Sequence, residues 1–323
     1  VDTPPDPDDP AFEYPLDDEL RIHHLQVKGT HNSYHVDTLD GAVADWAYTH
    51  ATLDVQAACE GVRQFELDVA LEEDGTFAVY HAPMVDEGTN CETFRACLGV
   101  LKGWSDANPA HHPIFVMVEP KDAYDAETIE AYFTTLEAAI EEVWPRERIV
   151  TPDDVKGGHE SIREALMAEG WPTLGESRGK LLLWLLEIGD YRTAYTFGDT
   201  SLDGRLMFVK SDVDHPYGAV LIRDDPVGEA DEIREGVLDR FLVRTRADNG
   251  GAEAVAGDLS RFEAAIDSGA TFISTDYAVP ADGMDYDITL PGGMPSSCNP
   301  VTAPDGCTPE AVEDPRFMST EGC

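Results

Sequence analysis

The sequence predicts an α/β protein built on a distorted (β/α)₈ barrel of the TIM type, followed by a disulfide-stapled C-terminal appendage. Between about residues 22 and 279, short apolar runs alternate with amphipathic stretches. Such repetition of strand and helix is typical of a parallel barrel. An open doubly wound sheet is the alternative, but no GxGxxG motif follows the first predicted strand.

The predicted elements follow the hydrophobic pattern along the chain. Short apolar runs predict strands over residues 25–28, 62–69, 77–80, 114–119, 180–187, 206–209, 241–244 and 271–274. Amphipathic stretches predict helices over residues 53–60, 126–143, 161–169, 229–238 and 251–268.

Composition changes at both ends of the chain. Residues 1–18 are rich in Pro and Asp, and we expect a loosely attached acidic arm there. The predicted barrel domain covers residues 19–279. Pro, Gly, Ser and Cys dominate residues 280–323, so we expect an appendage without catalytic residues.

The cysteines indicate an exported protein. There are 6 of them, and those close together in the sequence form two pairs, Cys91 with Cys97 and Cys298 with Cys307. None has the spacing of a zinc knuckle, and no His lies nearby to complete such a site. We therefore expect disulfides, which would leave Cys59 and Cys323 to pair with each other, although six cysteines allow about 15 connectivities.

The charge restricts the partners of the protein. With 64 Asp and Glu against 22 Lys and Arg, the net charge is −42. Nucleic-acid binding is excluded because it requires a basic surface, and strong attraction to an anionic membrane is disfavoured. Transient contact with a membrane surface remains compatible with this charge. The chain begins with Val1 rather than Met, so we expect a mature, secreted protein whose leader has been removed. We also expect the protein to be a monomer.

Oxygen-bearing side chains occur at the ends of several predicted strands. Asn32 follows the first strand, Glu66 and Asp68 end the second, and Glu119 ends the fourth. The C-terminal ends of barrel strands meet at one face, and residues two apart on a strand point to the same side. Three carboxylates and an amide without cysteine suit calcium better than zinc.

Two histidines occupy corresponding positions. His31 follows the first strand and His81 the third. Histidine exchanges protons near neutral pH, so both are candidates for acid, base or phosphate-stabilising work. Each of these residues alone would more often be structural, as a cap or a solvated acid. Their joint occurrence on successive strand ends favours function.

Basic residues are expected beside a phosphate. Lys121 follows the fourth strand, and Arg244 and Arg246 lie on the seventh predicted strand. We expect one of these arginines to face the barrel mouth, and we assign substrate contact to Arg246 because it is nearer the strand end. Asp276 either binds a substrate hydroxyl or structures the rim.

The strings GTHNSYH, RQFELDV, VYHA and VEPK resemble the bacterial calcium-dependent phosphatidylinositol-specific phospholipase C family. VRTRAD and STDY near the last predicted strands are similar to further landmarks of that family. The resemblance covers about residues 20–280. It implies that His31 and His81 are catalytic and that Lys121 lies near the substrate. The implied calcium ligands are Asn32, Glu66, Asp68 and Glu119.

The resemblance implies cleavage of phosphatidylinositol, or a related inositol phosphodiester, to diacylglycerol and inositol phosphate through a cyclic inositol phosphate. His81 would then be the general acid, and His31 would stabilise the phosphate. Two alternatives stay open. A glycerophosphodiester phosphodiesterase shares the barrel, the Glu-x-Asp and two histidines, but usually has His-Arg where this chain has His31-Asn32. A non-enzymatic calcium-binding barrel would not need the two histidines.

Overall fold

The structure is a computed structural model that describes residues 12–281, 283–318 and 323. Its strands are β1 (Leu25–Thr30), β2 (Gln64–Leu71), β3 (Phe77–Val79), β4 (Ile114–Pro120), β5 (Leu181–Leu185), β6 (Phe208–Val209), β7 (Val220–Ile222), β8 (Leu242–Arg246), β9 (Phe272–Thr275) and β10 (Ser296–Cys298). Its α-helices are α1 (Leu53–Ala58), α2 (Phe94–Ala107), α3 (Ile129–Glu141), α4 (Pro152–Lys156), α5 (Ile162–Ala168), α6 (Leu174–Ser177), α7 (Asp190–Tyr195), α8 (Ala230–Leu238), α9 (Ala252–Ala256), α10 (Ser260–Ser268) and α11 (Pro309–Val312). Short 3₁₀ helices are η1 (Ile22–His24), η2 (Ala44–Trp46), η3 (Arg146–Arg148) and η4 (Pro315–Phe317).

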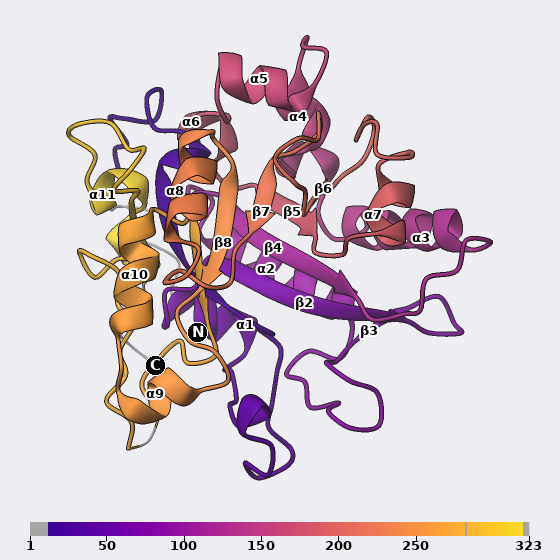
Figure 1. Cartoon of the computed structure of the whole chain (residues 1–323), viewed down its shortest axis with the longest axis vertical. Coiled ribbons are helices and arrows are strands. Elements are labelled where there is room, and N and C mark those ends of the chain that lie inside the picture. The colour runs from indigo at the N-terminus through magenta and orange to yellow at the C-terminus, as the bar shows by residue number, and fades with distance from the viewer. Residues whose placement is uncertain (1–11, 282, 319–322) are drawn as a thin grey trace.

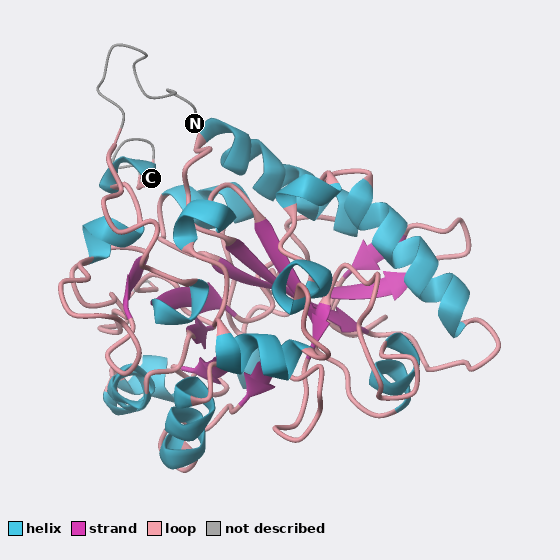
Figure 2. Ribbon diagram, turned by 90° about the horizontal axis from the view of Figure 1, so that it is seen from above, coloured by secondary structure: helices cyan, strands magenta, loops and turns pink. Residues whose placement is uncertain are grey.

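The strands form a nearly closed parallel barrel. Along the sheet the order is β6-β5-β4-β2-β1-β9-β8-β7, with all these neighbours parallel. The ring closes where Lys210, just after β6, bridges to Val220 at the start of β7. There the Ser211 amide donates to the Val220 carbonyl at 3.0 Å. Figures 1 and 2 show helices arranged around these strands. The predicted (β/α)₈ fold is confirmed.

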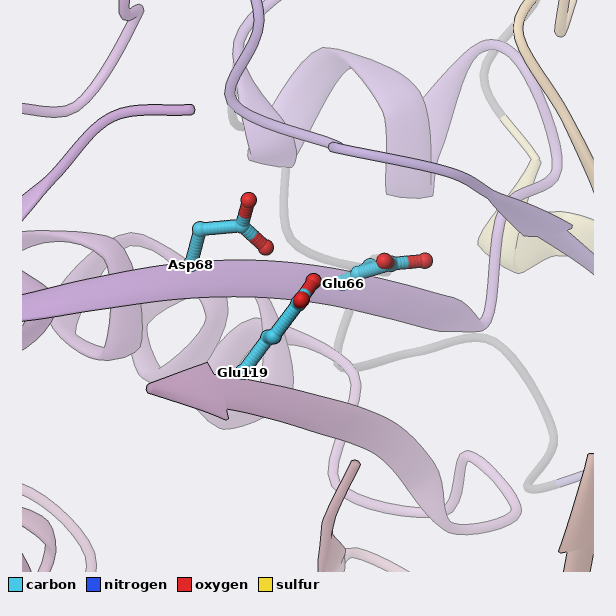
Figure 3. Close-up of side chains that lie close together, drawn as sticks. All are labelled: Glu66, Asp68 and Glu119. Carbon is cyan, nitrogen blue, oxygen red and sulfur yellow. The ribbon is translucent and has the colours of Figure 1, made fainter. Parts of the chain in front are cut away.

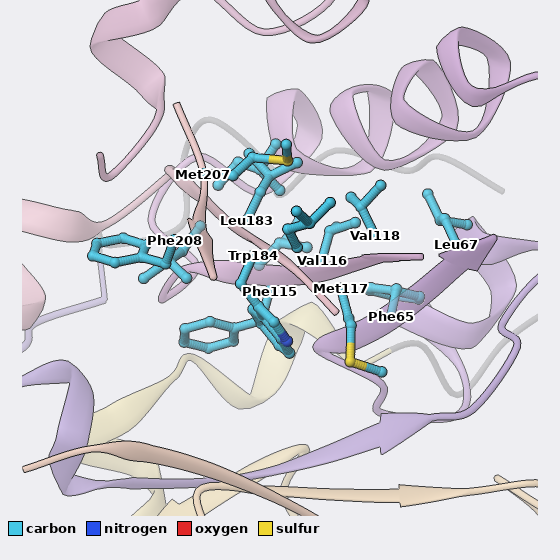
Figure 4. Close-up of a cluster of buried hydrophobic side chains, with 14 of the residues drawn as sticks. Phe65, Leu67, Phe115, Val116, Met117, Val118, Leu183, Trp184, Met207 and Phe208 are labelled. Carbon is cyan, nitrogen blue, oxygen red and sulfur yellow. The ribbon is translucent and has the colours of Figure 1, made fainter. Parts of the chain in front are cut away.

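Apolar strands build the barrel because both of their faces are buried. All residues of β5 are buried, as are five of the apolar residues of β4, namely Ile114, Phe115, Val116, Met117 and Val118. Inside, the Trp184 ring stacks on the Phe272 ring with centroids 5.0 Å apart. Figure 4 shows part of this core, where side chains of β2, β4, β5 and β6 pack together.

Several predicted elements differ from the observed ones. β3, predicted as a barrel strand, instead pairs antiparallel with β2. The eighth barrel strand is β7, which the sequence pattern missed because it has only 3 residues. The helix predicted over residues 251–268 is divided into α9 and α10 because Gly257 adopts a left-handed conformation with φ +64°. The 14-residue helix α2 was not predicted, since Gly99 and Gly103 in its interior weaken the helical pattern.

The N-terminal segment is firmly attached where the structure describes it. The Arg178 guanidinium binds the Asp17 carboxylate, with Nη2 2.6 Å from Oδ1, and lies over the Tyr14 ring. The expectation of a loose arm is therefore wrong for residues 12–18, and residues 1–11 lie outside the described part.

Residues beyond 280 pack against the barrel. β10 pairs antiparallel with the first half of β1, where Val27 faces Ser296. The disulfides are Cys59–Cys323, Cys91–Cys97 and Cys298–Cys307, which confirms the expected pairing. No helix in the described residues is long and apolar enough to cross a membrane.

Candidate active site

Three acids meet inside the barrel near the C-terminal ends of β2 and β4. Glu66 and Asp68 project from the same face of β2, and Asp68 is the register partner of Glu119 on β4. Figure 3 shows the three carboxylates gathered on one side of the two strands. One oxygen from each lies within 4.8 Å of the others, a spacing that a single metal ion can span.

The alternation of β2 explains why these acids point inward. Phe65 and Leu67 face the outer layer and are fully buried, so Glu66 and Asp68, which alternate with them, face the interior. Gln64, two residues before Glu66 on β2, also points into the barrel. Its Oε1 accepts a hydrogen bond from the Ser274 hydroxyl at 2.5 Å. A Cβ at position 29 would lie 2.1 Å from this oxygen, which accounts for Gly29 on the neighbouring strand.

Two cationic side chains contact the acids. Lys121 Nζ lies 2.7 Å from Asp68 Oδ2 and 3.0 Å from Glu119 Oε2. Arg244 Nη2 lies 3.1 Å from Glu66 Oε2. Burial nevertheless raises the pKa of Glu66 to about 7 and raises the pKa of Asp68 well above its ordinary value. Additional positive charge, as a proton or a bound cation, would therefore stabilise the cluster of acids.

Asn32 lies beside the acids on the chain that follows β1. The Ser33 amide donates to the Glu66 carbonyl at 3.0 Å, which holds this segment against β2. Asn32 has φ 43°, a left-handed conformation that asparagine tolerates better than most residues. Its Nδ2 donates to the Tyr48 hydroxyl, while its buried Oδ1 has no hydrogen-bond partner among the described residues. A hard cation would satisfy such an oxygen, so the donor set fits calcium.

His31 is held by a carboxylate after β9. Its Nδ1 lies 2.7 Å from Asp276 Oδ1, and its Nε2 lies 4.0 Å from Glu66 Oε1. Burial, together with the charges of Arg246 and Arg244, lowers the pKa of His31 well below its ordinary value. A neutral ring that donates from Nδ1 to Asp276 keeps Nε2 as a proton acceptor toward the acids.

Asp276 also binds Arg246, with Arg246 Nη2 2.6 Å from Oδ2. Both carboxylate oxygens of Asp276 thus have partners within the protein, and its side chain is almost fully buried. This arrangement fits the positioning of His31 better than contact with a substrate hydroxyl, which was one of the two roles that the sequence left open for Asp276.

His81 forms a second histidine–carboxylate pair on the loop after β3. Its Nδ1 lies 2.9 Å from Asp86 Oδ2, and His35 Nε2 lies 3.1 Å from the same carboxylate. The loop is tight because Ala82 and Asp86 exchange backbone hydrogen bonds at 2.9 and 2.8 Å. Sequence reasoning missed Asp86, which carries no motif of its own and is one of 64 acidic residues.

A cavity of about 270 Å³ opens above the acids, and its wall is strongly charged. The polar lining residues are His31, Glu66, Glu119, Glu187, Lys210, Asp224, Arg244 and Arg246. Both arginines of β8 reach it, because residues two apart on a strand share a face; the expectation that only one would do so is wrong. Of the other expected site residues, Asn32, Asp68 and Asp276 are buried behind this wall. His81 and Lys121 are outside its lining. Lys121 contacts Glu119 of the wall, whereas His81 contacts Asp86 on the loop after β3.

Comparison with known proteins agrees with this architecture. The chain matches the sequence profile described as phosphoinositide phospholipase C, Ca²⁺-dependent, over residues 20–78 and 71–300. The chain belongs to this family. The predicted enzyme class, phospholipase C action on phosphatidylinositol, and calcium as cofactor are thereby confirmed, and the phosphodiesterase and non-enzymatic alternatives are disfavoured.

Solved structures of phospholipases C share the fold. A calcium-dependent phosphoinositol-specific phospholipase C from Pseudomonas sp. in its apo form has a TM-score of 0.64 at 18% identity, covering 89% of this chain and 98% of that chain. Its myoinositol complex has a TM-score of 0.63 at 18% identity, covering 90% and 99%. The Ca²⁺-dependent phosphatidylinositol-specific phospholipase C from Streptomyces antibioticus has a TM-score of 0.59 at 20% identity, covering 80% and 95%. A search of curated proteins found no match.

Proposed function

We propose that the charged cavity at the barrel mouth is the site where this phospholipase C cleaves phosphatidylinositol or a related inositol phosphodiester. The observation that carries the proposal is one cavity lined by Glu66, Glu119, a carboxylate-held histidine and two arginines, with Asp68 completing the cluster of three acids beside it. Acids for a metal, a proton acceptor and phosphate-neutralising cations are the parts that phosphoryl transfer needs.

The calcium ligands in this proposal are Asn32, Glu66, Asp68 and Glu119. Calcium bound there would act as a Lewis acid that lowers the pKa of a coordinated hydroxyl and offsets phosphate charge. The cations of the cavity wall, Lys210, Arg244 and Arg246, would contact the phosphate from the other side.

His31 is proposed as the general base, in place of the phosphate-stabilising role expected from the sequence. Asp276 holds its Nδ1, so Nε2 can take the proton of the inositol hydroxyl adjacent to the phosphodiester. The hydroxyl oxygen then bonds to phosphorus while the bond from phosphorus to the glycerol oxygen breaks. His81 donates a proton to that leaving oxygen, giving diacylglycerol and a cyclic inositol phosphate. Water can open the ring with the two histidines in reversed roles.

Calcium-titrated ³¹P NMR of the products from phosphatidylinositol and glycerophosphoinositol tests this reaction. A cyclic phosphate that appears only with calcium is expected, and His81→Ala should reduce its rate about 10²- to 10⁴-fold. His159→Ala, at a surface histidine paired with Glu169, is the matched control. Glycerol 3-phosphate as product would instead indicate a glycerophosphodiester phosphodiesterase. Calcium binding without any turnover would indicate a binding protein.

Transient contact with a lipid surface is part of the proposal. Large apolar side chains are exposed on loops that follow the strands, around the end of the barrel that holds the cavity. These rim residues are Met84, Val85, Tyr124, Ile188, Val213, Val227 and Val279. Apolar side chains on a rim can enter the interfacial layer of a bilayer without basic residues. The three disulfides support secretion, and the monomeric state remains a prediction.

A further inference from the structure

We propose that Lys121 is a tethered cation that occupies part of the calcium site until the metal binds, and that calcium must displace it. The inference rests on the proposed function in one respect, namely that calcium binds the carboxylates of Glu66, Asp68 and Glu119. It changes the role of Lys121 from the substrate contact expected from the sequence to control of metal affinity.

The contacts of Lys121 identify it as a counter-ion of these carboxylates. Its ammonium group forms ion pairs with Asp68 at 2.7 Å and with Glu119 at 3.0 Å, and both partners are proposed calcium ligands. Its side chain is only 18% exposed and the Asp68 side chain is fully buried, so water screens the pair weakly. The backbone amide of Lys121 donates to the Val69 carbonyl at 2.8 Å, which fixes the base of the side chain next to β2.

The other cation at the acids is attached differently. Arg244 pairs with Glu66, but it also binds Asp224 and donates from Nε to the Ser274 hydroxyl at 3.1 Å. Its planar group is therefore held in place by partners outside the acid cluster. Lys121 carries its charge on a flexible four-carbon stem, so it can leave the acids without disturbing the strands.

Charge and space both make Lys121 a competitor of calcium. An ammonium group at these distances uses carboxylate oxygens that would otherwise face the metal, and its positive charge repels a divalent ion placed among the same oxygens. In the absence of metal, the same charge offsets repulsion between buried carboxylates. Lys121 should therefore stabilise the metal-free protein and weaken calcium binding, so that a change at this position moves the two properties in opposite directions.

Calorimetric calcium titration and thermal unfolding of Lys121→Met test the inference. We expect the variant to bind calcium about tenfold more tightly than the wild type, or better. We expect it to unfold at a lower temperature in EDTA and to recover that loss in saturating calcium. Lys102→Met removes a lysine whose ion pair with Asp106 lies on the surface of α2, and it should leave both properties unchanged. Lys121→Arg keeps the charge and should keep calcium binding weak.

The outcomes separate this inference from the proposed function. If the wild type does not bind calcium at millimolar concentration, the proposed metal site fails. If the wild type binds calcium and Lys121→Met binds it no more tightly, only the role of Lys121 is overturned. Should the Met variant not fold, Lys121→Gln removes the same charge with a polar side chain, and the same affinity comparison decides.

Discussion

The two histidine–carboxylate pairs of the proposed site have different electrostatic surroundings. Burial, and after it the charges of Arg246 and Arg244, lower the pKa of His31. His81 has its ion pair with Asp86, and the edge of the Trp46 ring contacts it at a centroid distance of 5.3 Å. His31 therefore has the surroundings of a proton acceptor, which supports its proposed role as base and leaves proton donation to His81.

Asp86→Asn should slow the chemical step about 10²-fold. The amide removes the carboxylate that holds His81 Nδ1 and can present a donor to that nitrogen, so the ring is no longer held in the orientation and tautomer of the wild type. The rate in saturating calcium, measured together with the calcium affinity, checks this. Glu87→Gln, at the exposed neighbouring acid, is the control. Equal loss of calcium binding in Asp86→Asn would instead indicate that Asp86 only maintains the fold.

For individual residues, the site could be predicted where the spacing of residues along a strand determines which way their side chains point. Glu66 and Asp68 are two apart on β2, so their common face followed from the sequence. The same rule applied to Arg244 and Arg246 predicts that both face the cavity. The pairing of Asp276 with His31 could not be predicted, because the two residues are 245 positions apart. Asp86 is 5 positions from His81 and 51 from His35, and no motif in the local sequence distinguishes it from the many other acidic residues.

At the scale of elements, apolar runs predicted most strands but not how they pair. The run that becomes β3 resembles a barrel strand in sequence, yet β3 folds back on β2 because the short turn after Leu71 brings Phe77 opposite Leu71. The sequence of such a short apolar run does not indicate whether the strand will pair in parallel or antiparallel. In turn, β7 is too short to stand out from the loops around it.

The chain after residue 280 also contacts the start of a barrel strand, at the end of the barrel opposite the cavity. Glu313, just after α11, pairs with Arg63 before β2, with Glu313 Oε2 2.7 Å from Arg63 Nη2 and both side chains fully buried. The Arg63 guanidinium also lies 4.3 Å from the centre of the Trp104 ring. This pair fastens the C-terminal segment to the start of the second barrel strand.

Glu313→Gln should lower the free energy of unfolding by about 3–5 kcal/mol, because it leaves the buried Arg63 charge without its partner. Urea or thermal unfolding measures the change, and Glu310→Gln, at an exposed position of α11, is the control. The double variant Arg63→Leu with Glu313→Leu should lose less than the single one, since it leaves no unpaired charge. A single variant as stable as the wild type would contradict the prediction.

For the whole molecule, the net charge and the apolar rim act in opposite directions at a lipid surface. A net charge of −42 repels anionic lipids, whereas the proposed contact through the rim residues would draw the protein to any bilayer. Binding should therefore be stronger on phosphatidylcholine vesicles than on vesicles containing phosphatidylserine. Added salt should reduce this difference by screening.

Met84→Ser should weaken vesicle binding severalfold, because Met84 is 92% exposed on the loop that also carries His81. Sedimentation with phosphatidylcholine vesicles measures the change, and turnover of a water-soluble substrate should stay near the wild-type value. Met167→Ser, at an exposed methionine of α5, is the matched control. Equal binding by the Met84 and Met167 variants would exclude the rim as the lipid contact.

The disulfide between Cys59 and Cys323 makes most of this enzyme a covalent ring, since the two residues are 264 positions apart. Every proposed site residue except His31 and Asn32 belongs to that ring. The bond can form only after Cys323 has been synthesised, so oxidation must follow translation of the complete barrel. Once it has formed, a protease that cuts a mouth loop located after Cys59 opens the ring at one point without separating the two pieces. A nicked molecule therefore keeps its fragments together until a reductant reaches the bond.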